Sequence, residues 1–301
     1  MNTKKNIAAS VRQRLLNRAR TDERPFAELL QYYAMERFLC RLSQSEHARR
    51  FILKGALLLR TWGSAIGRPT MDIDLSGRTS NDISAIQAQI TDVIGVASND
   101  GLVFDSKSLQ VQRITEEAEY EGIRARFLGY LGTARITMQI DIGFGDVVFP
   151  EPTEVELPSV LDADPFTMLG YSRESAIAEK VETMVKLGLV NSRMKDFHDI
   201  WLLSRGFDYS GALLQEAMVQ TFETRDTTIP PSPAAFTQRF IEEKQTQWQA
   251  YLRRMSETTA PTSFGSIMAQ VQTFTEPVLQ SIRSSDPFDV TWKAPGPWKI
   301  T

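Results

Sequence analysis

The chain has one cysteine, Cys40, among its 301 residues, so it can form neither an intrachain disulfide nor a site built on several thiolates. No apolar run approaches the roughly 20 residues that a membrane-spanning helix needs. The basic N-terminal segment lacks the apolar stretch of a secretory signal. These absences predict a cytoplasmic protein that does not associate with membranes.

The chain also lacks a strong net charge. Its formal charge is -3, whereas domains that bind nucleic acid are usually basic overall, so DNA binding is not expected. The apolar content of 42% and the charged content of 24% are those of an ordinary globular protein. Local basic clusters, most simply interpreted as solvated helix faces, comprise Arg12, Arg14, Arg18 and Arg20, and later Lys186, Arg193 and Lys195.

Hydrophobic spacing predicts an α+β protein with three segments. Residues 1–50 have helical spacing and are expected to pack as helices on a core formed by residues 51–150. Residues 151–301 are expected to form a mainly helical domain. Within that domain, residues 151–170 are rich in proline and are interpreted as a long surface connection. Residues 286–301 are interpreted as an irregular tail.

Strand-like runs give the central segment its predicted topology. They lie near Leu109–Thr115, Gly122–Leu128 and Arg135–Phe144, and the short turn-like gaps between them favour a β-meander. Before them, Asn81 is expected to cap a helix whose apolar stripe begins at Ile83.

Two aspartates lie on either side of one isoleucine in the segment RPTMDIDL. In an extended strand, residues two apart share a face, so Asp72 and Asp74 lie together while Ile73 and Leu75 enter the core. Two carboxylates held so close repel each other unless a positive species lies between them. The pattern therefore predicts a site for a divalent metal, Mg²⁺ or Mn²⁺, beside a bound nucleotide.

A third aspartate lies in the run ITMQIDIGF, in which apolar and polar side chains alternate. Asp141 lies on the polar face of this predicted strand. If the strand neighbours that of Asp72 and Asp74, three carboxylates converge in the geometry that holds two metal ions around a nucleoside triphosphate. Alternatively, Asp141 pairs with an arginine such as Arg126 or Arg135, because an unpaired buried carboxylate is costly.

Nucleotide contacts are predicted from residues ahead of the aspartate pair. Gly55 lacks a Cβ, so backbone N–H groups beside Lys54 and Gly55 could approach a phosphate. The simpler interpretation of the pair is a tight turn. Arg68 and Thr70 could reach triphosphate oxygens or could be surface groups.

A later helix, capped by Ser172, places Lys180 at the edge of its buried face. A lysine there needs an anion, either a carboxylate or a phosphate. Asp196 and Asp199 follow three residues apart and share a helix face. Either Lys180 pairs with an aspartate and pins two helices, or Lys180 grips phosphate while an aspartate orients it or acts as a base.

Several segments together resemble the AbiEii/AbiGii family of bacterial nucleotidyltransferase-like toxins, which includes the mycobacterial MenT toxins. The resemblance runs from about residue 8 to about residue 240. Its pieces are SVRQRLLNRAR, FILKGALLLRTWG, RPTMDIDL, QIDIGFGD and ESAIAEKVETMVKLGLVNSRMKDFHDIWLL.

The resemblance implies a DNA polymerase β-like nucleotidyltransferase core with added helices. Asp72 and Asp74 match the family's metal-binding pair, and Asp141 resembles the third carboxylate of the superfamily. The remaining matches, all implied by the resemblance, are Lys54 and Gly55 of the first motif, Lys180 of the third, and Asp196 and Asp199 of the fourth.

The implied activity is magnesium-dependent transfer of a nucleotide from a nucleoside triphosphate to an acceptor in a toxin–antitoxin or abortive-infection system. The resemblance makes a tRNA 3′ end the expected acceptor, so that translation stops, and a separately encoded antitoxin the expected partner. Two alternatives are an enzyme of this fold that modifies a protein or small molecule, and a GTP-binding regulator without transfer activity.

Overall fold

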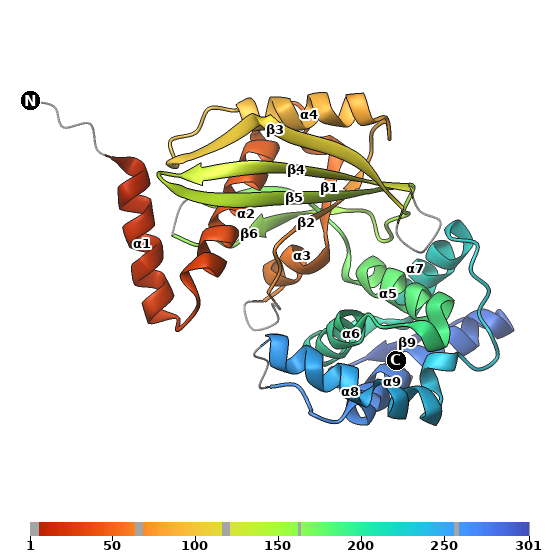
Figure 1. Cartoon of the computed structure of the whole chain (residues 1–301). Helices are drawn as coiled ribbons and strands as arrows, with labels where there is room; N and C mark the ends of the chain where they lie inside the picture. The colour runs from red at the N-terminus through yellow and green to blue at the C-terminus, as the bar shows by residue number, and fades with distance from the viewer. Residues whose placement is uncertain (1–5, 64–68, 116–120, 162–163, 256–258, 301) are drawn as a thin grey trace, which may run out of the picture. The chain divides into compact units, whose positions relative to one another are not determined.

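The structure, a computed structural model, describes residues 6–63, 69–115, 121–161, 164–255 and 259–300 (Figure 1). The chain folds into two compact units, each made of two chain segments. The first unit comprises Met1–Gly145 and Thr153–Gly170, and the second comprises Asp146–Pro152 and Tyr171–Thr301. Among the described residues, no helix is long and apolar enough to cross a membrane.

The first unit combines helices with one large mixed sheet (Figure 1). Its elements are α1 (Ile7–Thr21), α2 (Phe26–Gln44), the 3₁₀ helix η1 (Ala48–Arg50), β1 (Phe51–Lys54), α3 (Gly55–Thr61), β2 (Ile73–Gly77), α4 (Ile83–Gly95), β3 (Leu102–Thr115), β4 (Glu121–Leu131), β5 (Ala134–Phe144), β6 (Thr153–Leu157) and β7 (Phe166–Gly170).

The seven strands of this sheet lie in the order β3-β4-β5-β2-β1-β7-β6. Strands β3, β4 and β5 pair antiparallel in sequence, so the predicted meander is confirmed, with longer strands than expected. Strand β2 pairs parallel with β5 and antiparallel with β1. The strands that carry Asp74 and Asp141 are therefore neighbours.

Helices α2 and α4 cover one face of the sheet, and an aromatic cluster fills the space between them and the strands. The Phe38 ring of α2 lies 5.6 Å from the Phe127 ring of β4, and Phe104 of β3 lies 5.5 Å from Phe127. Ile140 and Ile142 of β5 are fully buried on the same side. The alternation of β5 therefore turns its polar residues to the other face, which carries the candidate site.

Two expectations about local structure in the first unit were wrong. The segment 151–170 was expected to be a surface connection, but it contains the antiparallel strands β6 and β7. Pro158 directly follows β6 and Pro165 directly precedes β7, so both prolines lie outside the strands and leave their hydrogen bonds intact. Helix α4 is capped by Asp82 instead of Asn81, because the Asp82 carboxylate accepts from the N–H groups of Ser84 and Ala85.

The second unit is mainly helical, as predicted, and also contains a small sheet. Its elements are α5 (Arg173–Leu187), η2 (Gly188–Val190), α6 (Met194–Gly206), β8 (Tyr209–Ser210), α7 (Gly211–Thr224), η3 (Ala234–Phe236), α8 (Gln238–Met255), α9 (Phe264–Ser284), β9 (Val290–Trp292) and β10 (Trp298–Ile300). Ser172 caps α5 as expected, through an acceptor oxygen to the Ser175 N–H.

The expected irregular tail is instead a pair of strands, β9 and β10, that joins β8. Aromatic packing explains why so short a sheet forms. The Trp292 ring lies 4.8 Å from Phe274 of α9, and the Trp298 ring stacks on Phe274 at 5.6 Å. The indole N–H groups of Trp292 and Trp298 donate to the carbonyls of Ser204 and Phe274.

Candidate active site

The structure brings together the three carboxylates that were predicted to hold metal. Asp74 of β2 lies directly opposite Asp141 of β5 in the parallel register, and Asp72 immediately precedes β2. Ile73 and Leu75 are fully buried, so the strand's alternation turns Asp74 away from the core. Carboxylate oxygens of the three aspartates lie within 4.8 Å of one another. Oxygen ligands at this spacing fit a divalent cation such as Mg²⁺ or Mn²⁺.

Gly55 makes room for the Asp74 carboxylate. Lys54 lies opposite Asp74 in the β1–β2 pair, and Gly55 follows it with a φ of +70°. A Cβ on Gly55 would lie 2.0 Å from Oδ2 of Asp74, far inside contact distance. Both the backbone conformation and the close approach therefore require glycine here. The observed role of Gly55 is to accommodate a carboxylate, and its predicted phosphate contact stays a prediction.

Asp141 forms a bidentate ion pair with Arg124, which was not among the predicted site residues. The Nε and Nη2 atoms of Arg124 donate to Oδ1 and Oδ2 of Asp141, each at 2.7 Å. Gln139 adds a third hydrogen bond to Oδ2, at 3.1 Å. The alternative that Asp141 pairs with an arginine is therefore correct, but the expected arginines were wrong. Arg126 instead donates to the side-chain amide oxygen, Oε1, of Gln139.

The remaining residues predicted to bind nucleotide are placed differently. The Thr70 hydroxyl donates to Oδ1 of Asp72, and the Thr70 N–H donates to the Tyr32 hydroxyl at 3.1 Å. Thr70 is buried and holds Asp72 in place, so its predicted contact with triphosphate stays untested. Arg68 lies outside the described residues.

A cavity of about 420 Å³ opens beside Asp72 within the first unit. The side-chain amide of Gln31 donates to the carbonyls of Met71 and Thr137, which fixes helix α2 against this cavity. A volume of this size holds a nucleoside-sized group. The lining residues are Ala27, Leu30, Gln31, Met71, Asp72, Arg135, Ile136, Thr137 and Gln139.

In the second unit, Lys180 of α5 meets both predicted aspartates of α6. Its Nζ lies 3.3 Å from Asp196 and 3.0 Å from Asp199. Arg193 adds a contact of 2.7 Å to Asp196. Burial opposes the ionisation of Asp196, but the charges of Lys180, Arg193 and Lys195 outweigh burial and hold its pKa below the usual range. The structure therefore shows the ion pair that joins two helices, and phosphate binding by Lys180 stays a prediction.

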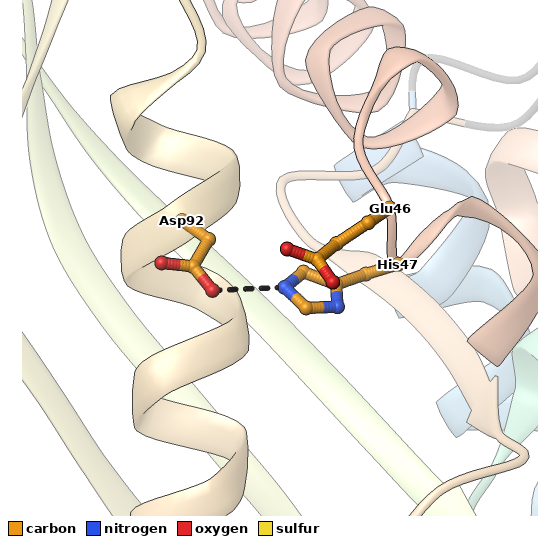
Figure 2. A group of neighbouring side chains, drawn as sticks. All are labelled: Glu46, His47 and Asp92. Carbon is orange, nitrogen blue, oxygen red and sulfur yellow. Dashed lines mark hydrogen bonds and ion pairs between the residues drawn. The ribbon is translucent and has the colours of Figure 1, made fainter.

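A second group of potential metal ligands, Glu46, His47 and Asp92, lies elsewhere in the first unit (Figure 2). Nε2 of His47 lies 3.0 Å from the Asp92 carboxylate. Nδ1 of His47 is buried and has no hydrogen-bond partner among the described residues. A metal on Nε2 would require the ring proton on Nδ1 and would leave that N–H buried and unpaired. The arrangement therefore favours a His47–Asp92 hydrogen bond with the proton on Nε2.

Comparison with known proteins identifies the family. The model of the family described as "Nucleotidyl transferase AbiEii toxin, Type IV TA system" matches residues 37–270. The chain belongs to this family. The match covers the aspartates of the first unit together with Lys180, Asp196 and Asp199 of the second. The chain is therefore a nucleotidyltransferase of the AbiEii toxin family, and type IV systems pair such a toxin with a separate antitoxin.

Two solved structures of low sequence identity are similar to the chain. MenT4, a nucleotidyltransferase toxin from Mycobacterium tuberculosis H37Rv, is 15% identical, with a TM-score of 0.51 over 93% of this chain and 99% of its own. JHP933 from Helicobacter pylori is 10% identical, with a TM-score of 0.46 over 86% of this chain and 94% of its own. No curated protein matches the sequence. The likeness to MenT4 supports the fold, and the predicted α+β class is confirmed.

Arg124 and Gln139 were missed by the sequence interpretation. Alternation along β4 places Arg124 and Arg126 on one face, and this pattern is present in the sequence. The register that sets Arg124 opposite Asp141, and Arg126 opposite Gln139, follows from the pairing of β4 with β5. Choosing between the two arginines requires that register, which the sequence pattern alone does not supply.

Proposed function

We propose that this AbiEii-family chain transfers a nucleoside monophosphate from a nucleoside triphosphate to a hydroxyl of an RNA, with a tRNA 3′ end as the acceptor. The observation that carries the proposal is the convergence of Asp72, Asp74 and Asp141, whose carboxylate oxygens lie within 4.8 Å of one another. Three converging acidic side chains are a poor arrangement for stability alone, because like charges repel. They suit a cation-assisted transfer of a phosphate group.

Asp72 and Asp74 would hold the divalent ion, Mg²⁺ or Mn²⁺, and Thr70 fixes the orientation of Asp72. When bound, such an ion supplies charge neutralisation on the triphosphate. The acceptor oxygen forms a bond to the α-phosphorus while the bond from that phosphorus to the bridging oxygen breaks. Pyrophosphate leaves, and the hydroxyl proton passes to Asp141.

Two further features support the proposal. The cavity beside Asp72 has room for one nucleoside, either that of the triphosphate or the terminal one of the acceptor. Lys180, Asp196 and Asp199 are retained as proposed phosphate and positioning groups because the family model spans them. All four nucleoside triphosphates are included in the test.

The test uses α-labelled nucleoside triphosphates, Mg²⁺ and total bacterial RNA, with label measured in RNA, protein and small-molecule fractions. Wild type is expected to label tRNA, whereas Asp74→Asn does not. The matched control is Asp289→Asn, which removes an exposed carboxylate from the second unit and should label tRNA like wild type. Label in protein or in a small molecule would replace the RNA acceptor. Bound nucleotide without any label would favour a nucleotide-binding regulator.

A further inference from the structure

The pairing of Asp141 has a consequence for how the site takes up metal. Oδ1 of Asp141 accepts one hydrogen bond, from Nε of Arg124, and Oδ2 accepts two, from Nη2 of Arg124 and from Gln139. A carboxylate oxygen offers about two acceptor positions. Counting only donors from the part of the chain that the structure describes, both acceptor positions of Oδ2 are occupied and Oδ1 retains one.

The position of the Arg124–Asp141 ion pair in the sheet favours its stability. Arg124 and Asp141 lie directly opposite each other in the β4–β5 ladder, so the backbone sets their approach. Their side chains are only 17% and 18% exposed, which limits screening by water. Two parallel N–H donors that match both oxygens form the strongest geometry available to an arginine and a carboxylate. A lysine in place of Arg124 could not form these two parallel hydrogen bonds.

A second arginine reinforces the arrangement. Nε of Arg126 donates to the side-chain Oε1 of Gln139 at 2.9 Å, and this contact directs the side-chain NH₂ group of Gln139 toward Asp141. One carboxylate oxygen of Asp141 lies within 4.8 Å of a carboxylate oxygen of Asp72 and of Asp74. A cation entering between the three aspartates therefore meets a carboxylate already committed to other donors.

We propose that Arg124 is a counter-ion that competes with the divalent metal for Asp141. Asp141 then coordinates the metal only when its hydrogen bonds to the Arg124 guanidinium group weaken. The inference rests on the proposed metal-dependent transfer for its catalytic meaning, but metal binding alone can test it. Arg124 then sets the metal affinity of the site and keeps three carboxylates together while no cation is bound. It is a positioning residue, because it acts through Asp141.

The decisive measurement is Mn²⁺ binding, followed by electron paramagnetic resonance, on the full chain. We compare wild type with Arg124→Gln, Asp141→Asn and the double variant. Arg124→Gln is expected to bind Mn²⁺ about tenfold more tightly, because a competing positive charge is removed while three carboxylates remain. Asp141→Asn weakens binding, and adding it to Arg124→Gln cancels the gain. The control Arg239→Gln removes an exposed arginine of α8 and leaves the affinity unchanged.

A structural role for Arg124 gives a different pattern. Loss of a purely structural ion pair would lower the thermal stability and weaken Mn²⁺ binding together. Equal or weaker Mn²⁺ binding in folded Arg124→Gln would therefore overturn the proposal. In transfer assays, the Mg²⁺ concentration that gives half the maximal rate should fall in Arg124→Gln, while Arg124→Lys lies between this variant and wild type.

The two proposals can fail separately. If wild type transfers no nucleotide to any acceptor while Arg124→Gln still binds Mn²⁺ more tightly, the proposed function fails and the counter-ion stands. If transfer depends on Asp74 while Arg124→Gln binds Mn²⁺ no more tightly than wild type, the function stands and the counter-ion is wrong.

Discussion

The two units of the chain each gather acidic side chains, but they balance the charges differently. In the first unit, Asp72, Asp74 and Asp141 converge on one partly exposed sheet face. In the second unit, Asp196 and Asp199 are buried, and both contact Lys180. Converging carboxylates create a demand for a cation, whereas buried carboxylates that contact a lysine hold helices together. The same residue types therefore point to chemistry in one unit and to stability in the other.

The largest effect that would test this contrast is loss of transfer in Asp74→Asn. We expect the rate to fall at least about a hundredfold, as when a single group that stabilises a transition state is removed. The variant should unfold at or above the wild-type temperature, because one of three converging negative charges is gone. Label incorporation and thermal unfolding of the same preparation measure both quantities. A large loss of stability would show that Asp74 is mainly structural.

In the second unit, Lys180→Met should have the opposite signature. Removing one partner of a buried ion pair costs about 3–5 kcal/mol. In this variant both aspartates lose the ammonium group that contacts them, although Asp196 keeps Arg193. Lys180 is 14% exposed and Asp199 is fully buried, so screening by water gives little relief. Chemical unfolding of the full chain measures the loss. An unchanged free energy of unfolding would contradict the interpretation that Lys180 stabilises the second unit.

Lys180→Arg provides the matched variant, since it keeps the positive charge. If Lys180 also grips phosphate, this variant should raise the KM for the nucleoside triphosphate while the free energy of unfolding stays close to that of wild type. An unchanged KM in a folded, active variant would speak against phosphate binding. The pair of variants thus separates a stabilising lysine from one that also contacts substrate.

A smaller effect on stability is expected from Gly55→Ala. Alanine would be strained at the φ of +70° that Gly55 adopts. Its Cβ would lie only 2.0 Å from Oδ2 of Asp74 and would displace the carboxylate. Strain of this kind costs roughly 1–3 kcal/mol. The transfer rate should also fall, because the added Cβ displaces the Asp74 carboxylate. Ala56→Gly, at the next position, is the control, and it should leave the orientation of Asp74 unchanged.

Particular residues show what the sequence could and could not predict. Alternation around Ile73 and Ile140 located the three aspartates, and Ser172 marked the start of α5, because these signals are local. The facing of Asp74 and Asp141 depends on a parallel pairing between strands far apart in sequence, which was only a condition in the prediction. The contact between Gly55 and Asp74 and the choice of Arg124 depend on the same register.

The hairpin of β6 and β7 and the strands β9 and β10 were missed for a different reason. Proline-rich composition suggested loops, yet the prolines flank these strands. The short strands are held by pairing and by aromatic contacts such as Trp298 on Phe274, not by strong local preference. The proline-rich composition therefore predicted the turns correctly but gave no indication of the short strands beside them.

The smallest expected effect concerns the acid stability of the second unit. The folded pKa of Asp196 is held below its usual range, chiefly by Lys180 and Arg193 against the cost of burial. A depressed pKa contributes stability above the unfolded pKa of about 4, and this contribution is lost as the pH falls toward the folded pKa. Asp196→Asn should therefore unfold at a lower temperature than wild type at neutral pH, and the difference should shrink as the solution is acidified below about pH 4. Thermal unfolding of both proteins across this range measures the difference. A gap that stays constant with pH would show that Asp196 stabilises the unit by packing and hydrogen bonding, without a contribution from its charge.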